Sequence, residues 1–501
     1  MKRLRPFVLI LLLMPVSGAG EARAGLSFAD TRFRLTYDAL TLPAGEKMGL
    51  LGTSLLVDQE WRGPLRFEAG LGVYSAVEGE RGGFFTGGLA LNTRLQRAGW
   101  ALEAGFFVGG GGGDAAPQGG GLMLRPHISV LRDFETFSAG LMASRVRFPN
   151  GEIDSSQVGI QIDIPMPLVF VEGTIEDADT AALVWRRFYI APVVQWYNPR
   201  SGVKNTVGSP VSDKTRLIGI EAGRFLGASY FAFIESAGAM RGNADGYAEF
   251  LGGAGARFVL NERLALHLKG AVGGAGGGNV DTGGGVIFKG SGGLAFKMRP
   301  DLSLGLDYGV AEGLDGAFSA TMTKAAFQYH LEMALPASNA PAFDLQALKQ
   351  GRWALRPSVL RYVSSSRLRK AGPRDDPVDL FSLKMDRYIL PAVYLSGQAG
   401  AAYRGGAGGY ATGLFGLGAQ KNWTRDMIVL GELLVGAGGG GGIASDGGGI
   451  VQPMLGLRYL VTEKQGIQVM AGRVMALEGR LDATVIDIGW VYLLNTLERL
   501  D

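Results

Sequence analysis

A glycine-rich hairpin that occurs three times constrains the fold of this chain more than any other feature. The first copy runs from Gly109 to Gly113, through the tip Asp114-Ala-Ala-Pro-Gln118, to Gly119 and two further glycines. The second copy starts at Gly276 and closes from Gly283, and the third starts at Gly438 and closes from Gly447. The first glycines of the closing triplets, Gly119, Gly283 and Gly447, are equally spaced along the chain. A fixed period of this kind indicates an internal structural repeat.

Between the hairpins, apolar residues alternate with other residues at the two-residue period of β-strands. The segment from Leu65 shows the pattern, because Phe67, Ala69, Leu71 and Val73 share one face. The alternation predicts eight strands in repeat 1, near residues 28–42, 48–61, 65–78, 83–96, 100–111, 120–133, 136–148 and 153–164. Repeat 2 is predicted from about Arg186 to Leu331, and repeat 3 from about Gly351 to Leu494.

The first residues have the features of a secretory signal peptide. Three basic residues precede an apolar run from Phe7 to Val16, and small residues lead to Ala24, where we expect cleavage. Cleavage would remove four basic residues and one acidic residue, so the formal charge of +3 would fall to zero. The balance of charge therefore does not favour nucleic acid as a partner. No apolar run approaches the roughly 18 residues that a membrane helix needs.

Glycine makes up 81 of 501 residues while hydrophobic residues still make up 47%. A transmembrane β-barrel combines alternating apolar segments with a fully paired backbone. We therefore predict an all-β fold, an antiparallel transmembrane β-barrel with three repeats of about eight strands each. The predicted divisions are a signal peptide at 1–24, repeat 1 at 25–166, a linker plus repeat 2 at 167–333, and a linker plus repeat 3 at 334–501.

The turns alternate in length, which predicts how the sheet is oriented. Short turns such as Arg97-Ala-Gly99 alternate with longer ones that include the glycine hairpins. Outer-membrane barrels have short periplasmic turns and longer external loops, so we expect the hairpins to face outward. Trp61, Trp100 and Trp423 flank short turns, where an interfacial aromatic girdle would lie.

Eight strands per repeat permit either three tandem small barrels or one barrel of about 24 strands. Long linkers, residues 165–185 and 332–350, separate the repeats, and the second has loop residues followed by a candidate short helix. A barrel of about 22 strands has a lumen that known transporters plug, and no plug domain precedes the first predicted strand. These features favour three small barrels.

The last predicted strand resembles the C-terminal assembly signal of bacterial outer-membrane β-barrel proteins. The matching residues are Asp487, Gly489, Tyr492 and Leu494, and seven residues follow them where the family commonly ends on an aromatic residue. Related patterns end repeat 1 at Ile164 and repeat 2 at Leu331. The resemblance implies residence in the outer membrane of a Gram-negative bacterium, and it implies the barrel-insertion machinery as a partner.

The sequence offers little for catalysis, for a cofactor or for a metal. The three histidines, His127, His267 and His330, lie on the polar faces of different strands, and there is no Gly-x-Ser-x-Gly motif. The absence of cysteine excludes thiolate metal sites and disulfides. Gly109 to Asp114 fits one calcium-binding nonapeptide, but such repeats act in stacked arrays and this one stands alone. We therefore predict no enzymatic activity, no cofactor and no metal.

The glycine runs predict close packing, because glycine allows another backbone to approach. The neighbour would belong to this chain or to a protein partner. Basic residues in two outer loops are candidate contacts for anionic glycans or lipopolysaccharide, with a merely solvated loop as the alternative. These residues are Arg200, Lys204, Lys214 and Arg216 in repeat 2, and Arg367, Arg369, Lys370 and Arg374 in repeat 3.

Three functions follow from these features. The first is an integral outer-membrane protein, in contact with membrane lipids, with a structural, assembly or surface-binding role and no catalysis. The alternative is a channel or export conduit for solutes, polysaccharide or protein. The third, a lipid-active barrel enzyme, lacks a nucleophile, a base and an orienting group within one repeat.

Overall fold

A computed structural model describes residues 25–59, 65–166, 168–172, 183–211, 213–336, 348–363, 365–370 and 376–499. Within these residues the chain is almost entirely antiparallel β-structure, with one 3-10 turn, η1 (Pro43–Gly45). The prediction of an all-β antiparallel fold is confirmed. No helix in the described ranges has the length and apolar character needed to cross a membrane.

Repeat 1 forms barrel 1, in which β9 pairs with β2 and closes the ring. Its strands are β2 (Thr31–Thr41), β3 (Lys47–Gln59), β4 (Leu65–Glu78), β5 (Phe85–Arg97), β6 (Trp100–Gly112), β7 (Met123–Asp133), β8 (Ser138–Arg147) and β9 (Asp154–Pro165).

Repeat 2 forms barrel 2, in which β11 pairs with both β12 and β18. Its strands are β11 (Leu183–Pro199), β12 (Thr215–Phe225), β13 (Tyr230–Arg241), β14 (Ala248–Val259), β15 (Leu264–Gly276), β16 (Val286–Arg299), β17 (Leu302–Gly313) and β18 (Ser319–Pro336).

Repeat 3 forms barrel 3, in which β26 pairs with both β25 and β19. Its strands are β19 (Leu348–Tyr362), β20 (Val378–Leu390), β21 (Val393–Arg404), β22 (Ala411–Asn422), β23 (Met427–Gly439), β24 (Gly449–Leu460), β25 (Gln465–Ala476) and β26 (Asp482–Arg499). A single pair, Met333 with Glu498, joins β18 to β26, so each repeat closes through its own first and last strands.

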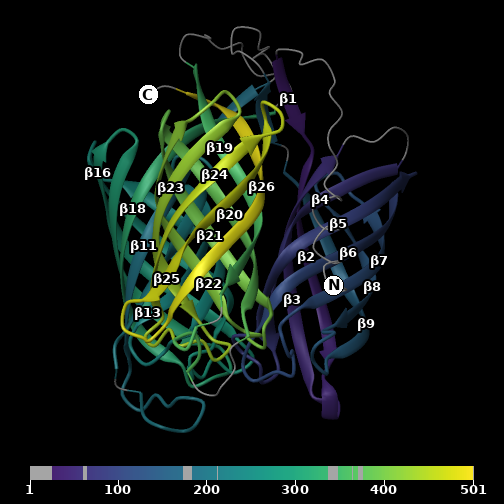
Figure 1. The fold of residues 1–501 in the computed structure, drawn as a ribbon, viewed down its shortest axis with the longest axis vertical. Coiled ribbons are helices and arrows are strands. Elements are labelled where there is room, and N and C mark those ends of the chain that lie inside the picture. The colour runs from purple at the N-terminus through teal and green to yellow at the C-terminus, as the bar shows by residue number, and fades with distance from the viewer. Residues whose placement is uncertain are drawn as a thin grey trace.

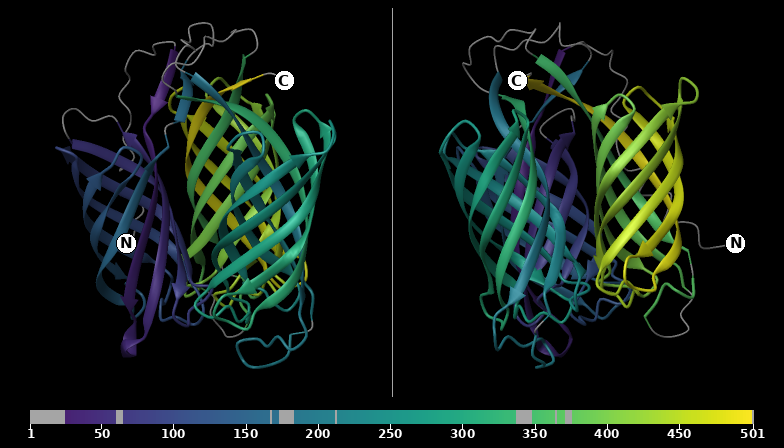
Figure 2. Two further views of the ribbon diagram at one scale, coloured as in Figure 1. Left: turned by 180° about the vertical axis from the view of Figure 1, so that it is seen from behind. Right: turned by 90° about the vertical axis from the view of Figure 1, so that its left-hand side faces the viewer.

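The three barrels stand side by side with their axes roughly parallel (Figures 1 and 2). The glycine hairpins join β6 to β7, β15 to β16 and β23 to β24, and they lie at one end of the barrels. We call this the hairpin end, which is the lower end in Figure 1. Strands β9 and β18 end, and β11 and β19 begin, at the opposite end, which we call the linker end.

The predicted strand positions in repeat 1 agree with the structure to within about three residues, apart from one break. The strand predicted at 28–42 is interrupted at Asp30, because β1 (Gly25–Ala29) leaves the barrel and pairs with β10 (Leu168–Glu172). Strand β10 lies in the first linker, where no strand was predicted. The signal peptide, Trp61 and most of the candidate helix fall outside the described residues.

Each barrel reverses the usual distribution of side chains, with apolar residues outside and charged residues inside. On β9, Ile160 is 51% exposed while the next residue, Gln161, is 0% exposed. Successive side chains of a strand point to opposite faces, so the alternation in the sequence produces this reversal directly. The outer apolar residues include Ile128, Leu141, Val158, Leu268, Leu306, Leu433 and Leu455, all more than half exposed.

Candidate functional site

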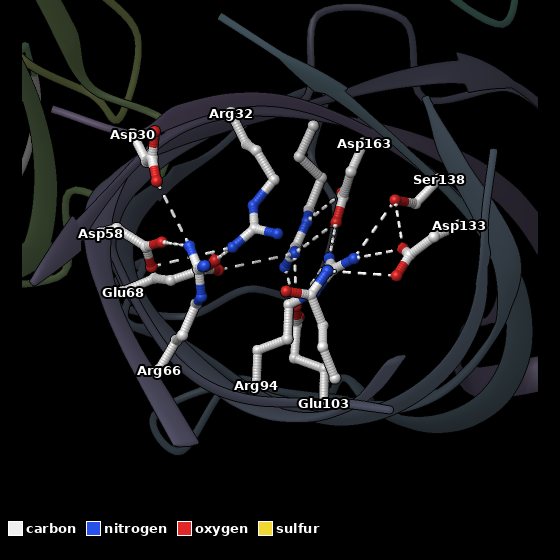
Figure 3. A network of polar contacts seen from close by, with 12 residues as sticks. Asp30, Arg32, Asp58, Arg66, Glu68, Arg94, Glu103, Asp133, Ser138 and Asp163 are labelled. Atoms are coloured by element: carbon white, nitrogen blue, oxygen red, sulfur yellow. Dashed lines mark hydrogen bonds and ion pairs between the residues drawn. The ribbon is translucent and has the colours of Figure 1, made fainter. Parts of the chain in front are cut away.

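Ion pairs fill the middle of barrel 1 (Figure 3). Arg34 donates to both oxygens of Asp163, at 2.7 and 3.0 Å, and to both oxygens of Glu103, at 2.6 Å each. Arg94 reaches across the same space to Asp163 and Asp133, at 2.8 Å each. Since these residues come from strands on different sides of the ring, their ion pairs cross the lumen.

Barrels 2 and 3 have their own internal networks. In barrel 2, Lys324 donates to Glu221 and Glu235 at 2.7 Å each. In barrel 3, Arg356 lies 2.7 Å from Asp386 and 2.6 Å from Glu432. All of these side chains are buried, and a buried charge is tolerated only when it is paired. Opening any of the lumens would therefore require several buried ion pairs to separate.

An apolar cluster lies under the loops of the hairpin end in each barrel. In barrel 1, Phe84 packs edge-on against Phe148, with ring centroids 5.9 Å apart. In barrel 3, Tyr410 packs in the same way against Tyr362, also at 5.9 Å. Tyr247 takes the corresponding place in barrel 2. Each lumen is thus filled by charged pairs in the middle and by aromatic rings below the loops.

The three histidines lie inside their barrels, as their positions on the polar strand faces predict. His127 lies 3.1 Å from Glu103, His267 is bonded to Asp307, and His330 lies 3.0 Å from Ser303. They belong to barrels 1, 2 and 2, so they do not converge. In the part of the chain that the structure describes, no three His, Asp or Glu side chains are placed to hold a metal ion.

A second loop, which the sequence analysis missed, recurs once in each barrel. We call these the GxxxG loops: residues 79–84 between β4 and β5, 242–247 between β13 and β14, and 405–410 between β21 and β22. Each has glycine at its first and fifth positions and an aromatic residue at its sixth. The glycines all have φ between +89° and +105°, a conformation that side chains disfavour. The three loops are equally spaced along the chain, and that regularity was the available signal.

The GxxxG loops receive the glycine hairpins of neighbouring barrels. A Cβ atom on Gly121 would lie 2.4 Å from the carbonyl oxygen of Ala402 in barrel 3. The equivalent distances are 2.7 Å from Gly285 to Ala76 and 2.1 Å from Gly448 to Ala239. No side chain fits at such distances, so glycine is required at each of these three contacts.

These contacts form a closed cycle of three junctions. The hairpin of barrel 1 docks on barrel 3, that of barrel 2 on barrel 1, and that of barrel 3 on barrel 2. Backbone bonds support two junctions, from Gly409 to Gly111 at 3.2 Å and from Gly82 to Gly283 at 3.1 Å. Arg241 of barrel 2 forms an ion pair of 2.7 Å with Glu478 of barrel 3 in the remaining junction. The neighbour of the glycine runs is therefore another repeat of the same chain.

The repeat spacing needs a small correction at the third hairpin. The bonded pairs Gly111 with Gly121, Ala275 with Gly285, and Gly438 with Gly448 are equivalent in the three hairpins. The interval from Gly285 to Gly448 is shorter by one position than the interval from Gly121 to Gly285. The paired residues are equally far apart in sequence in all three hairpins, so the shorter interval arises before the third hairpin. Gly447 therefore corresponds to Gly284 and Gly120 instead of Gly283 and Gly119.

The predicted basic contacts are placed differently in the two loops. Lys204 is exposed, and Arg200 forms a half-exposed ion pair with Glu312 at 2.9 Å. Arg367 lies 3.5 Å from Asp482 and is exposed. Binding of an anionic glycan by these residues stays a prediction.

Arg369 and Lys370 instead bind other loops of the protein. Arg369 is buried and donates to the backbone oxygens of Gly405 and Gly441. Lys370 is bonded to Asp245 of barrel 2, across the junction. Arg374 lies outside the described residues.

The residues of the assembly pattern lie on β26. Asp487 points into barrel 3 and lies 2.7 Å from Lys384, and Gly489 faces Ser358 so closely that a Cβ would lie 2.5 Å from the Cβ of Ser358. Tyr492 and Leu494 are partly exposed. Strand β26 continues to Arg499, beyond the end of the pattern. Use of the pattern by an insertion machinery stays a prediction.

Arg81 ties together three loops at the hairpin end of barrel 1. It donates to Glu46 at 2.8 and 2.7 Å and to the backbone oxygen of Asp114 at 2.8 Å. The hydrogen bonds from Arg81 lower the pKa of Glu46 below its usual value. Burial at the hairpin tip raises the pKa of the Asp114 carboxyl.

Comparison with known proteins gives no family assignment. No protein-family model matches the chain, and no curated protein matches it. Among solved structures, OccAB3 of Acinetobacter baumannii is 10% identical, with 93% of this chain and 99% of that chain covered and a TM-score of 0.23. A mutant ferric enterobactin receptor of Pseudomonas aeruginosa, in complex with enterobactin, is 10% identical, with coverage of 93% and 81% and a TM-score of 0.30.

The siderophore receptor PirA of Acinetobacter baumannii is 8% identical, with 92% of this chain and 80% of that chain covered and a TM-score of 0.29. At such TM-scores these likenesses carry no argument about the activity of this chain. The chain resembles bacterial outer-membrane β-barrel proteins at low identity.

Proposed function

We propose that this protein is an integral outer-membrane protein built from three non-conducting barrels, with a structural or surface-binding role. The observation that carries the proposal is the reversed distribution of side chains, with apolar residues outside and buried ion pairs inside. In water such an outer face would expose a large apolar area, whereas lipid tails match it. The barrel strands, such as β8 with 10 residues and β16 with 14 residues, are long enough to cross a bilayer when tilted.

The filled lumens support the non-conducting part of the proposal. Eight strands leave an interior just wide enough for side chains. Here those side chains are charged pairs and aromatic rings, which leave no open path for solute. The hairpin end would face outward, in contact with lipopolysaccharide, and the exposed residues Arg200, Lys204 and Arg367 would be among its basic contacts. We propose no catalytic activity and no cofactor.

The test has two measurements on the full chain. After export, the protein should fractionate with outer membranes, and in planar bilayers it should show only small conductance. A soluble periplasmic protein would overturn the membrane proposal. Openings of nanosiemens size would overturn the non-conducting proposal.

A channel or export conduit is the second candidate. The observation that favours it is the polar, charged lining of all three lumens, since water-filled barrels have polar interiors. The compared structures include receptors for siderophores, but that role is theirs. A conduit would require the ion pairs of Arg34, Lys324 or Arg356 to separate. The nanosiemens openings that would overturn the first proposal would support this one.

A further inference from the structure

The three junctions share one layout but differ at two equivalent positions. One is the residue before the GxxxG loop, which is Glu78, Arg241 or Arg404 in barrels 1, 2 and 3. The other lies in the loop after β8, β17 or β25. Asn150, Asp315 and Glu478 each precede a glycine that packs against the tip of its own hairpin: Gly151, Gly316 and Gly479. Each of the three side chains lies beside a hairpin glycine, which is Gly120, Gly284 or Gly447 respectively. Two junctions therefore have a carboxylate at this position, and the third has a neutral amide.

Both carboxylates have a partner, which for Asp315 belongs to its own barrel and for Glu478 lies across the junction. Asp315 accepts a hydrogen bond of 3.0 Å from the backbone N–H of Gly284. Glu478 forms its ion pair of 2.7 Å with Arg241, the residue before the GxxxG loop of barrel 2. The residue at the equivalent place in barrel 3 is Arg404, which faces the junction that has Asn150. Arg404 thus lacks the carboxylate that Arg241 has across its junction.

A cavity of about 550 Å³ lies where that carboxylate would be. Its walls include Arg404, Asn150, Asp376 and the backbone of Gly120. The side chain of Arg404 is 57% exposed, and its nearest carboxylate, at 3.8 Å, is Asp379, which is already bonded to Arg361 at 2.6 Å. The arginine therefore keeps hydrogen-bond donors for a ligand.

We propose that this cavity binds an acidic sugar, a hexuronate unit of a surface polysaccharide. Its carboxylate would pair with Arg404, as Glu478 pairs with Arg241. Asp376 would repel a ligand that carries a second negative charge, but its carboxylate can accept hydrogen bonds from hydroxyl groups of the sugar. The side-chain amide of Asn150 can both donate and accept hydrogen bonds. The walls carry no large apolar side chain. A ligand with one carboxylate and several hydroxyl groups fits this set of partners.

The proposal rests on the surface-binding role, and its test is independent of membrane location and conductance. Galacturonate is titrated against the full-length protein in detergent micelles, with galactose as the neutral control, and binding is followed by saturation-transfer NMR. Galacturonate should bind saturably and galactose should bind much more weakly. Equal binding of the two sugars, or no saturable binding of galacturonate, would overturn the proposal.

Two variants identify the site. Arg404→Gln should weaken galacturonate binding about 10- to 150-fold, because a charged hydrogen bond is worth about 1.5 to 3 kcal/mol. Asn150→Glu should abolish galacturonate binding, because the new glutamate would itself pair with Arg404. The junction should stay stable in this variant. The matched control is Arg241→Gln in the junction that is already filled, which should bind galacturonate as the unchanged protein does.

Folding of each variant is checked by its heat-modifiable electrophoretic mobility. Undiminished binding by folded Arg404→Gln or Asn150→Glu would overturn the assignment to this cavity. Tighter binding of N-acetylglycine than of galacturonate would overturn the sugar as the ligand, because a peptide carboxylate would then fit better.

Discussion

Replacing Gly83 by alanine would test whether the junctions hold the barrels together. Gly83 belongs to the GxxxG loop of barrel 1 and has φ of +89°. A Cβ there would lie 2.2 Å from the backbone nitrogen of Gly277 and 2.4 Å from the carbonyl carbon of Gly276, both in barrel 2. The added methyl group would therefore press on backbone atoms, which cannot turn aside as a flexible side chain can.

The chain offers a matched control in the same barrel. Gly45 has φ of +83°, and a Cβ there would meet nothing within 4 Å. Alanine at either glycine costs about 1 to 2 kcal/mol for the left-handed backbone. Only Gly83→Ala adds the cost of overpacking, typically about 1 to 3 kcal/mol. The difference in stability between the two variants therefore measures the overpacking at the junction alone.

Hydrogen exchange of the Gly82 amide measures this difference, because that N–H donates across the junction to Gly283. Local exchange reports the free energy of local opening. The amide should exchange about 5 to 150 times faster in Gly83→Ala than in Gly45→Ala, since about 1.4 kcal/mol corresponds to a factor of ten. Equal exchange in the two variants would refute the reasoning, because the contact would then contribute nothing to holding barrels 1 and 2 together.

Three further predictions concern the lumen of barrel 1, the loops at its hairpin end, and the junction between barrels 2 and 3. Arg94→Leu should lower the free energy of unfolding of barrel 1 by about 3 to 5 kcal/mol, because it leaves buried carboxylates with fewer partners; urea denaturation measures this, and an unchanged midpoint would contradict it. The pKa of Glu46 is lowered, so its bond with Arg81 stabilises the loops above the usual glutamate pKa of 4.5 and is lost as the pH falls below that value; the protection of the amides in residues 79–84 from exchange, relative to their intrinsic rates at each pH, should fall in acid, but not in Glu46→Gln. Cysteines replacing Gly238 and Ala437 should form a disulfide, since their Cβ atoms would be 3.0 Å apart, which a small shift would open to the roughly 3.8 Å of a disulfide, and the chain has no other cysteine; an unshifted band on a non-reducing gel would contradict the junction between barrels 2 and 3.

The strands could be predicted because their cause is local. Alternation between apolar and polar residues sets which side chain lies on the outer face of the barrel and which faces the lumen, as Ile160 and Gln161 show. Strand β4 was predicted with its observed limits, Leu65–Glu78. By contrast, β1 and β10 pair across the whole of barrel 1, whose eight strands lie between them in the chain. Nothing in either short segment identifies its partner, so the pairing was missed.

The glycine hairpins could be predicted from the sequence because their pattern is local. The GxxxG loops on which they dock could not be predicted in the same way. Runs such as Gly109 to Gly113 are conspicuous, whereas a GxxxG loop has only two required glycines and one aromatic residue. The sequence indicated close packing without indicating what lies opposite. Arg369 shows the same limit, since a basic loop residue gave no sign that backbone oxygens of Gly405 and Gly441 would bind it.

A cyclic arrangement of unlike surfaces gives a reason for keeping three barrels in one chain. Each junction joins a hairpin to a different surface, a GxxxG loop, and such contacts close into a ring when the rotation between units permits it. Three identical subunits would need the same residues at every junction. In one chain, however, each junction can have its own residue at the position of Asn150, Asp315 and Glu478. The junction between barrels 2 and 3 is bridged by Glu478, which pairs with Arg241. The junction between barrels 3 and 1 retains Arg404 and the cavity that we assign to an acidic sugar.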